Sequence, residues 1–223
     1  SEVPVAAGAA GGQPVFIETE VDRHDPYVQG MVRYTIRLFL RVKLAEGRLS
    51  EPQPDNALLR RLGDDREYSV EREGRRYRVI ERRYAIFPQA SGELRLPPPV
   101  LDGRIPEKSS RRNNRLQDFF GRDPFDDPFF GRTPLADAFT SSRPLRVRGK
   151  AQVLNVRPRP DQAGSHPWLP AKSVELHENW RPQGGEVRVG EPLTRTVTIR
   201  AHGVSGEQLP DLEPGAAEGF KVY

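Results

Sequence analysis

The sequence predicts an all-β protein made of tandem immunoglobulin-like β-sandwich domains, the second of them incomplete in this chain. Several short runs alternate between apolar and polar residues, which is the period of a half-buried strand. Turn residues separate these runs, since the 223 residues include 22 prolines and 20 glycines. No segment shows a convincing helical period, and short strands divided by turns are typical of sandwich folds.

The first two expected strands lie at residues 15–21 and 32–44. The segment 15–21 places Val15, Ile17 and Val21 on one face, and residues 22–30 supply turn residues. The run VRYTIRLFLRVKL, residues 32–44, alternates over its whole length. Its other face is mostly arginine and lysine, which predicts one solvent-facing side.

A loop is expected over residues 45–56, and a β-hairpin over residues 66–89. Glu73-Gly74 joins the two strands of this hairpin, because the glycine suits a tight turn with positive φ. The second strand has apolar residues on both faces, so the pattern leaves open which face is buried. A turn at Ser91-Gly92 then leads into a short strand around Leu94 and Leu96.

Residues 143–160 alternate again and predict the closing strand of the first sandwich. Leu145, Val147, Ala151 and Val153 share one face of this strand. The first domain then exceeds the roughly 100 residues that such a sandwich needs, and the excess is a long insert. The expected division is a flexible leader (1–12), a first sandwich (13–157) with an insert at 106–142, a linker (158–170) and the start of a second sandwich (171–223).

The second domain is predicted from a weak internal repeat. Gly30 and Gly190 each precede an alternating strand that contains a threonine followed by an aliphatic residue. Residues 171–223 amount to about half a sandwich, judged against the roughly 100 residues of a whole one. Either the chain was cut at this point, or the partner strands lie beyond Tyr223.

No catalytic, cofactor-binding or metal-binding residues are expected from the motifs. The chain has no cysteine, and its four histidines lack the spacing of metal ligands. It also lacks a phosphate-binding loop and a nucleophile elbow. The sequence therefore predicts a protein that is not an enzyme, and a site assembled from distant residues remains the lowest-ranked alternative.

Nucleic acid is not expected as a partner, although the net charge is +4. Acidic residues are interleaved with the arginines almost everywhere, which is typical of a solvated surface. The arginine-rich segment 60–83 could present Tyr68, Tyr77 and the nearby Tyr84 as a stacking platform for single strands. Its acid content instead favours cross-strand pairing of arginine with glutamate.

Three segments resemble the bacterial oxygen-tolerance (aerotolerance) protein family BatD. They are DPYVQGMVRYTIRLFL, GRRYRVIERRYAIFPQASGELRLPPPVLDG and LPAKSVELHENWRPQGGEVRVGEPLTRTVTIRAHGVSGEQLP. The most specific parts are the Tyr-x-Ile-Phe-Pro-Gln-x-Ser-Gly run from Tyr84 to Gly92 and the Val-Gly-Glu-Pro run from Val189 to Pro192. The likeness covers most of residues 13–223.

The resemblance implies a location and partners, but no catalytic residues. BatD-like proteins have a cleaved signal, tandem β-sandwich domains facing the periplasm and a later transmembrane helix. They are encoded beside von Willebrand factor A-type membrane proteins and a MoxR-type AAA ATPase. We therefore expect a non-enzymatic interaction or scaffold module at the periplasmic face of the inner membrane, in an aerotolerance or envelope stress-resistance complex, with the membrane anchor outside this chain.

A carbohydrate- or peptidoglycan-binding sandwich module is the alternative function. Trp168 and Trp180 are the only tryptophans available as sugar platforms. Trp180 is expected to be a core or inter-domain residue instead, because tryptophan is highly buried on average.

The stretch DFFGRDPFDDPFFGR, residues 118–132, is the candidate for partner contact. If the partner is a von Willebrand factor A domain, an aspartate of this stretch could complete its metal site, while phenylalanines act as apolar anchors. The alternatives are phenylalanines that fold back onto the sandwich, or a loop without fixed structure. The candidate residues are Phe119, Phe120, Asp123, Phe125, Asp126, Asp127, Phe129 and Phe130.

Overall fold

The computed structural model describes residues 5–7, 12–106, 142–164, 168–181, 188–212 and 221. Within these ranges the regular structure is β-strand, apart from two short 3-10 turns, η2 (Asp161–Ala163) and η3 (Gly206–Gln208). The predicted all-β class is therefore confirmed.

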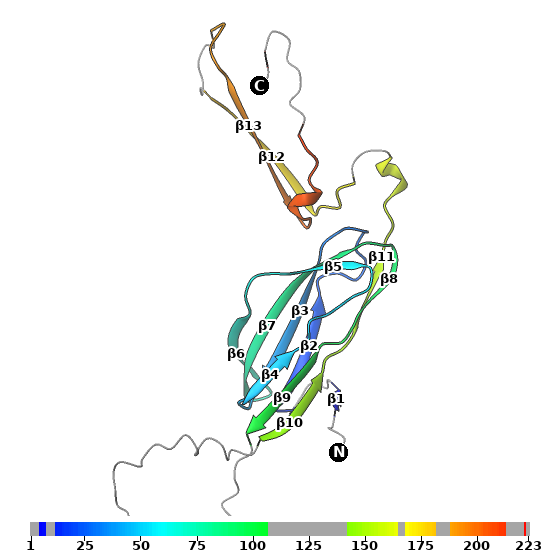
Figure 1. Ribbon diagram of the computed structural model, residues 1–223, viewed down its shortest axis with the longest axis vertical. Helices are drawn as coiled ribbons and strands as arrows, with labels where there is room; N and C mark the ends of the chain where they lie inside the picture. The colour runs from blue at the N-terminus through cyan, green and yellow to red at the C-terminus, as the bar shows by residue number, and fades with distance from the viewer. Residues whose placement is uncertain are drawn as a thin grey trace, which may run out of the picture.

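The larger sheet of the first domain has five strands, in the order β2-β3-β7-β5 with β6 also paired to β7. All of its pairings are antiparallel. The register places β3 along one edge of the long strand β7 and both β5 and β6 along the other. Figure 1 shows β7 between β3 and β6. The strands are β2 (Val15–Val21), β3 (Val32–Leu40), β5 (Ala57–Arg61), β6 (Arg66–Arg72) and β7 (Arg75–Pro88).

Two smaller sheets cover the other side of the core. One has the order β1-β10-β9-β4, in which only the β1–β10 pairing is parallel, and the other pairs β11 with β8. The chain runs from β8 into β9 and from β10 into β11, which joins these sheets into one layer. The strands are β1 (Val5–Ala7), β4 (Glu46–Leu49), β8 (Gly92–Leu96), β9 (Val100–Pro106), β10 (Ser142–Arg148) and β11 (Gln152–Val156).

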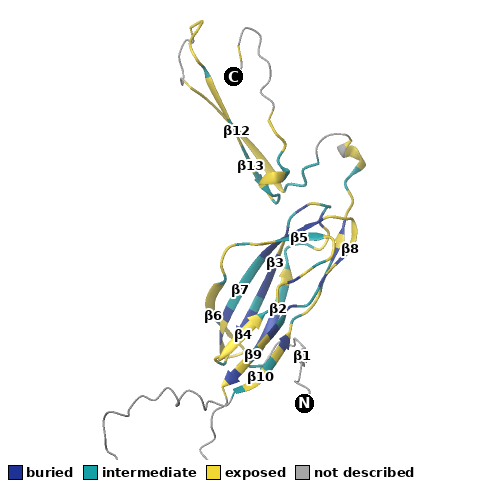
Figure 2. Cartoon of the chain, in the orientation of Figure 1, coloured by how far each residue is buried: buried dark blue, intermediate teal, exposed yellow. Residues whose placement is uncertain are grey.

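One hydrophobic cluster joins the two layers into a β-sandwich. Ile36 and Ile86 of the five-stranded sheet belong to the same buried cluster as Leu96, Leu101 and Leu154 of the opposite layer. All five side chains are at most 2% exposed. Figure 2 shows the buried positions on the strands of this sandwich, while the hairpin β12–β13 is mostly exposed. The immunoglobulin-like identity of the sandwich stays a prediction.

The strand expected at residues 32–44 is shorter than predicted, and its outer face is less exposed to solvent. β3 ends at Leu40, and Phe39 and Thr35 of its predicted solvent face are buried. Phe39 stacks on Phe16, with ring centroids 4.4 Å apart, and Tyr77 packs edge-on against Phe16. This second cluster gives the outer face of the sheet a small core of its own.

The strand expected at residues 143–160 is broken into β10 and β11. The set of alternate residues that face the core shifts by one position between these two strands. Leu154 and Val156 are buried in β11, whereas Ala151 and Val153, which were predicted to face inward, are not. Gly149 lies at the break, where a Cβ atom would come within 2.9 Å of Pro99 Cγ. The side chains of Pro99 and Ile17 thus leave no room for a Cβ atom at the point where the regular alternation stops.

Three further differences concern segments without clear alternation. β4 lies inside the loop expected at residues 45–56, and β5 follows it directly. Residues 5–7, within the segment expected to be a flexible leader, pair with β10.

The predicted turn at Glu73-Gly74 is confirmed, since Arg72 pairs with Arg75 and both turn residues have positive φ, 50° and 69°.

The C-terminal part contains a two-stranded antiparallel hairpin, β12 (Ser173–Arg181) and β13 (Thr194–His202). Its register aligns Ser173 with His202 and Arg181 with Thr194 without a bulge. An isolated hairpin is marginally stable in water, so this pair needs a further layer on one side. Its assignment to a second sandwich stays a prediction.

Candidate interaction surfaces

The sequence-predicted contact stretch lies outside the described residues. This applies to all eight candidates, Phe119, Phe120, Asp123, Phe125, Asp126, Asp127, Phe129 and Phe130. The metal-completing role of the aspartates therefore stays a hypothesis, and the surfaces below come from the described part of the chain.

The hairpin β12–β13 has one apolar and one polar face. The register pairs Val174 with Ala201 and Leu176 with Ile199 on the same side, and Trp180 follows at the far end of that side. Val174, Leu176 and Trp180 are 50%, 60% and 42% exposed. We call this side the apolar hairpin face, and its residues are Val174, Leu176, Glu178, Trp180, Arg195, Val197, Ile199 and Ala201.

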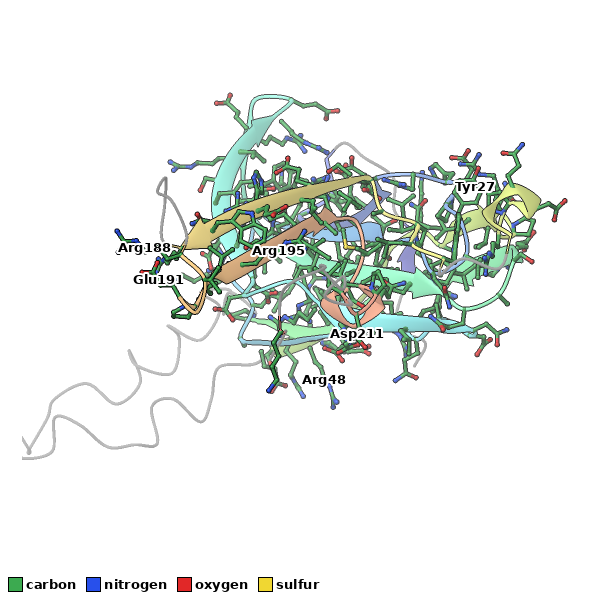
Figure 3. All side chains as sticks on the ribbon, turned by 90° about the horizontal axis from the view of Figure 1, so that it is seen from above. Tyr27, Arg48, Arg188, Glu191, Arg195 and Asp211 are labelled. Carbon is green, nitrogen blue, oxygen red and sulfur yellow. The ribbon has the colours of Figure 1, made fainter. Side chains whose placement is uncertain are left out.

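The two charged residues of the apolar hairpin face neutralise each other. Arg195 Nε lies 3.1 Å from Glu178 Oε1, and its Nη2 lies 3.3 Å from Oε2. The same guanidinium lies 5.4 Å from the ring centroid of Trp180, within the range of a cation–π contact. Figure 3 shows Arg195 on the hairpin ribbon, while Arg188 and Glu191 mark its distal turn. A partner for this face therefore needs no complementary charge.

Aromatic contacts fasten the segment before the hairpin to the first sandwich. The indole Nε1–H of Trp168 donates to the Val28 carbonyl at 3.1 Å. The Trp168 ring meets Tyr27 edge-on with centroids 5.6 Å apart, and the Arg157 guanidinium lies 4.1 Å above the same tyrosine. These contacts give Trp168 a structural role at the junction and leave Trp180 as the exposed tryptophan.

Polar contacts hold the base of the hairpin. Lys172 Nζ lies 2.9 Å from Asp22 Oδ2, and the Met31 amide donates to the Gly203 carbonyl at 3.1 Å. After β13, Gln208 Nε2 donates to the Gln29 carbonyl at 3.0 Å. The contacts come from residues more than 140 positions apart in the chain, so no local motif could have predicted them.

The arginine-rich hairpin β6–β7 forms cross-strand ion pairs, as its acid content predicted. Arg78 pairs with Glu67, and Arg82 pairs with Asp65. The three tyrosines proposed as a nucleic-acid platform are separated, since Tyr77 and Tyr84 are buried and Tyr68 donates its hydroxyl to Glu81. These three tyrosines therefore do not form a shared stacking platform.

Ion pairs lower the pKa values of two carboxyl groups of this sheet, and burial raises that of one tyrosine. The hydrogen bond from Arg82, opposed in part by burial, holds the pKa of Asp65 below its usual value. Burial raises the pKa of Glu81, but hydrogen bonds from Arg37 and Tyr68 outweigh this effect and lower it overall. Burial, with the neighbouring Tyr84, raises the pKa of Tyr34 well above the usual range.

Among the described residues, no group of three or more histidine, aspartate or glutamate side chains could hold a metal ion. No helix in the described ranges is long and apolar enough to cross a bilayer. No family model, no curated protein and no solved structure matches the chain.

Proposed function

We propose that this protein is a non-enzymatic interaction or scaffold module. It acts at the periplasmic face of the bacterial inner membrane, in a complex that supports aerotolerance or resistance to envelope stress. The observation that supports the interaction role best is the apolar hairpin face, where Leu176 and Trp180 are solvent-exposed beside a self-neutralised ion pair. The cellular setting rests on the resemblance to BatD-like proteins.

The proposed occupant of the apolar hairpin face is an uncharged, apolar surface of a partner protein; the competing occupant is the remaining strands of the predicted second sandwich. A partner with an unpaired charge at this surface would bury that charge against Val174 and Leu176, which is unfavourable. The aromatic and polar junction at Trp168 and Lys172 fixes the hairpin to the sandwich, so the face is presented in a defined direction. The resemblance gives von Willebrand factor A-type membrane proteins as partners, with the MoxR-type ATPase acting indirectly.

Site-specific photo-crosslinking in the native envelope tests this proposal, with the complete natural protein carrying the crosslinker at Leu176. His177 is the matched control, because it is the next residue of β12 and lies on the opposite face. We expect a crosslink to a separate protein from position 176 and little from position 177. Equal crosslinking at both positions, or only intramolecular products from position 176, would contradict the proposal.

A carbohydrate-binding role is the second candidate, because the exposed Trp180 ring lies on a sheet face beside the Glu178–Arg195 pair. Such a ring can stack on a sugar, and the charged pair can hydrogen-bond its hydroxyl groups. Titration with peptidoglycan fragments, followed by tryptophan fluorescence, distinguishes the two functions. Saturable quenching that is lost in Trp180→Ala would favour the carbohydrate role over the protein-binding role.

A further inference from the structure

The outer face of the five-stranded sheet carries many charges, and most of them are paired within the face. Arg37 bonds to both Glu20 and Glu81, at 2.6 and 2.9 Å. Arg72 contacts both carboxylate oxygens of Glu18. These cross-strand pairs explain the high charge content of the sheet without any ligand.

One position on this face departs from the pattern. The Nε–H of Arg83 is buried and has no hydrogen-bond partner in the structure. It lies at a hollow of about 180 Å³ in the surface of the sheet. Buried donors are nearly always satisfied, so an open donor at a hollow points to a group that enters from outside.

Two neighbouring side chains add donors to the same hollow. Thr35 lies directly opposite Arg83 in the β3–β7 register, is only 6% exposed and lines the hollow. Arg33 is two residues earlier on β3, on the same side of the sheet, and is exposed at the rim. Two guanidinium groups and one hydroxyl therefore line a small hollow, an arrangement suited to an oxyanion.

The local charge selects the type of anion. The acids at the hollow already have partners, since Arg37 holds Glu20 and Glu81 while Lys172 holds Asp22. The residues that line the hollow carry three carboxylates and three guanidinium groups, and Lys172, which pairs with Asp22 from outside the lining, adds one positive charge nearby. A monoanionic group fits this balance, whereas a phosphate dianion would be repelled by Glu20 and Glu81.

We propose that the hollow binds a carboxylate group, with Arg83 and Arg33 as its charged donors and Thr35 as a third donor. The planar fork of an arginine matches the two oxygens of a carboxylate, so the Nε–H of Arg83 would gain its missing acceptor. The carboxylate comes from an acidic side chain of a peptide or from a free organic acid. This inference is separate from the proposed function, because its donors lie on another sheet; the two share only the Lys172–Asp22 ion pair.

The test is a calorimetric titration of the protein with two monoanionic probes, sodium acetate and a terminally blocked Gly-Glu-Gly peptide. We expect saturable binding of at least one probe, which identifies the source of the carboxylate. Arg83→Gln and Arg33→Gln should each weaken this binding at least tenfold. Arg78→Gln is the matched control, because Arg78 is on the same strand but is exposed and already paired with Glu67.

A measurement on the unmodified protein guards against a variant that fails to fold. The Nε–H resonance of Arg83 in a nitrogen-15 spectrum should shift and become protected from solvent exchange as the bound probe is added. Three results would overturn the proposal. They are no saturable binding of either probe, unchanged binding in a folded Arg83→Gln variant, and tighter binding of inorganic phosphate than of both carboxylates.

Discussion

Lys172 and Asp22 are separated by 150 positions in the chain, yet their charged groups lie 2.9 Å apart. The Asp22 carboxylate is also the acceptor for the backbone N–H of Arg33 at 2.9 Å. Since only 12% of the Asp22 side chain is exposed, it is the better-shielded member of the pair. One carboxylate thus links the end of β2, the start of β3 and the base of the hairpin.

Replacement of Asp22 should loosen this junction while the sandwich stays folded. In Asp22→Ala we expect amide exchange of Met31, which donates to Gly203 across the junction, to become faster by about fivefold, as a loss of roughly 1 kcal/mol would produce. Asp25→Ala is the control, because Asp25 is exposed and lies 3.7 Å from Arg157. Equal exchange in the two variants would contradict a special role for Asp22.

The stability of the sandwich should fall in acid because of Asp65 and Glu81. Both carboxyl groups have a pKa in the folded state below the unfolded value, so their contribution is complete above the unfolded values of about 4. It is lost as the pH falls through the folded values. Urea unfolding at pH 7, 5, 4 and 3 should show this loss, and it should be smaller in the double variant Asp65→Asn, Glu81→Gln. The same slope in both proteins would refute the assignment.

Removal of either of two buried tyrosine hydroxyls should change the free energy of unfolding, but in different directions. The Tyr34 hydroxyl is buried without a hydrogen-bond partner, so Tyr34→Phe should leave the free energy of unfolding unchanged or raise it by about 1 kcal/mol. The Tyr77 hydroxyl donates to the Gln13 carbonyl at 3.1 Å, so Tyr77→Phe should lower that free energy by about 1 kcal/mol. Chemical denaturation measures both, and a large loss in Tyr34→Phe would show that its hydroxyl has a partner.

A replacement at Glu73 should stabilise the turn between β6 and β7. Its φ of 50° lies in the left-handed region that asparagine and glycine tolerate better than glutamate. Glu73→Asn gives the Asn-Gly pair favoured in two-residue hairpins and should raise stability by about 0.5 kcal/mol. Gly74→Ala, at φ 69°, should lower it by about 1 kcal/mol or more. A rise in melting temperature for Gly74→Ala would contradict this account of the turn.

The segment 107–141 should be replaceable by a short turn. The register pairs Pro106 directly with Ser142, so the two strand ends lie side by side where the segment leaves and re-enters the sandwich. A variant with Asn-Gly in its place should fold with a stability within about 1 kcal/mol of the parent, since loop length has a small effect on closure entropy. Loss of the cooperative unfolding transition in this variant would show that the sandwich depends on the segment.

The alternation in the sequence predicted the main strands because a sandwich strand buries every second residue. It failed at Phe39, whose face is covered by Phe16 and Tyr77 from other strands, and at Gly149, where the side chains of Pro99 and Ile17 leave no room for a Cβ atom and the inward-facing positions shift. It also missed β4 and β5, whose short segments hold too few alternating residues to separate from a loop. Such outcomes depend on tertiary contacts that local sequence does not contain.

The candidate surfaces were predictable to different degrees. The alternation of Val174 and Leu176 was visible in the sequence, but their exposure depends on what covers the hairpin. The hollow beside Arg83 joins residues of β3 and β7 that are about 50 positions apart, and their spacing matches no motif. Sequence reasoning could place these arginines on strands, but only the sheet register brings Arg33, Thr35 and Arg83 together.

The pairing of Pro106 with Ser142 also bears on how such a protein changes over generations. The ladder that pairs Leu101 with Val147 in the core extends up to these two residues, so it is formed entirely by β9 and β10. If the sandwich folds without the intervening segment, selection on folding and selection on the function of that segment act on separate stretches of the gene. Lineages could diversify that segment rapidly while inheriting an unaltered scaffold.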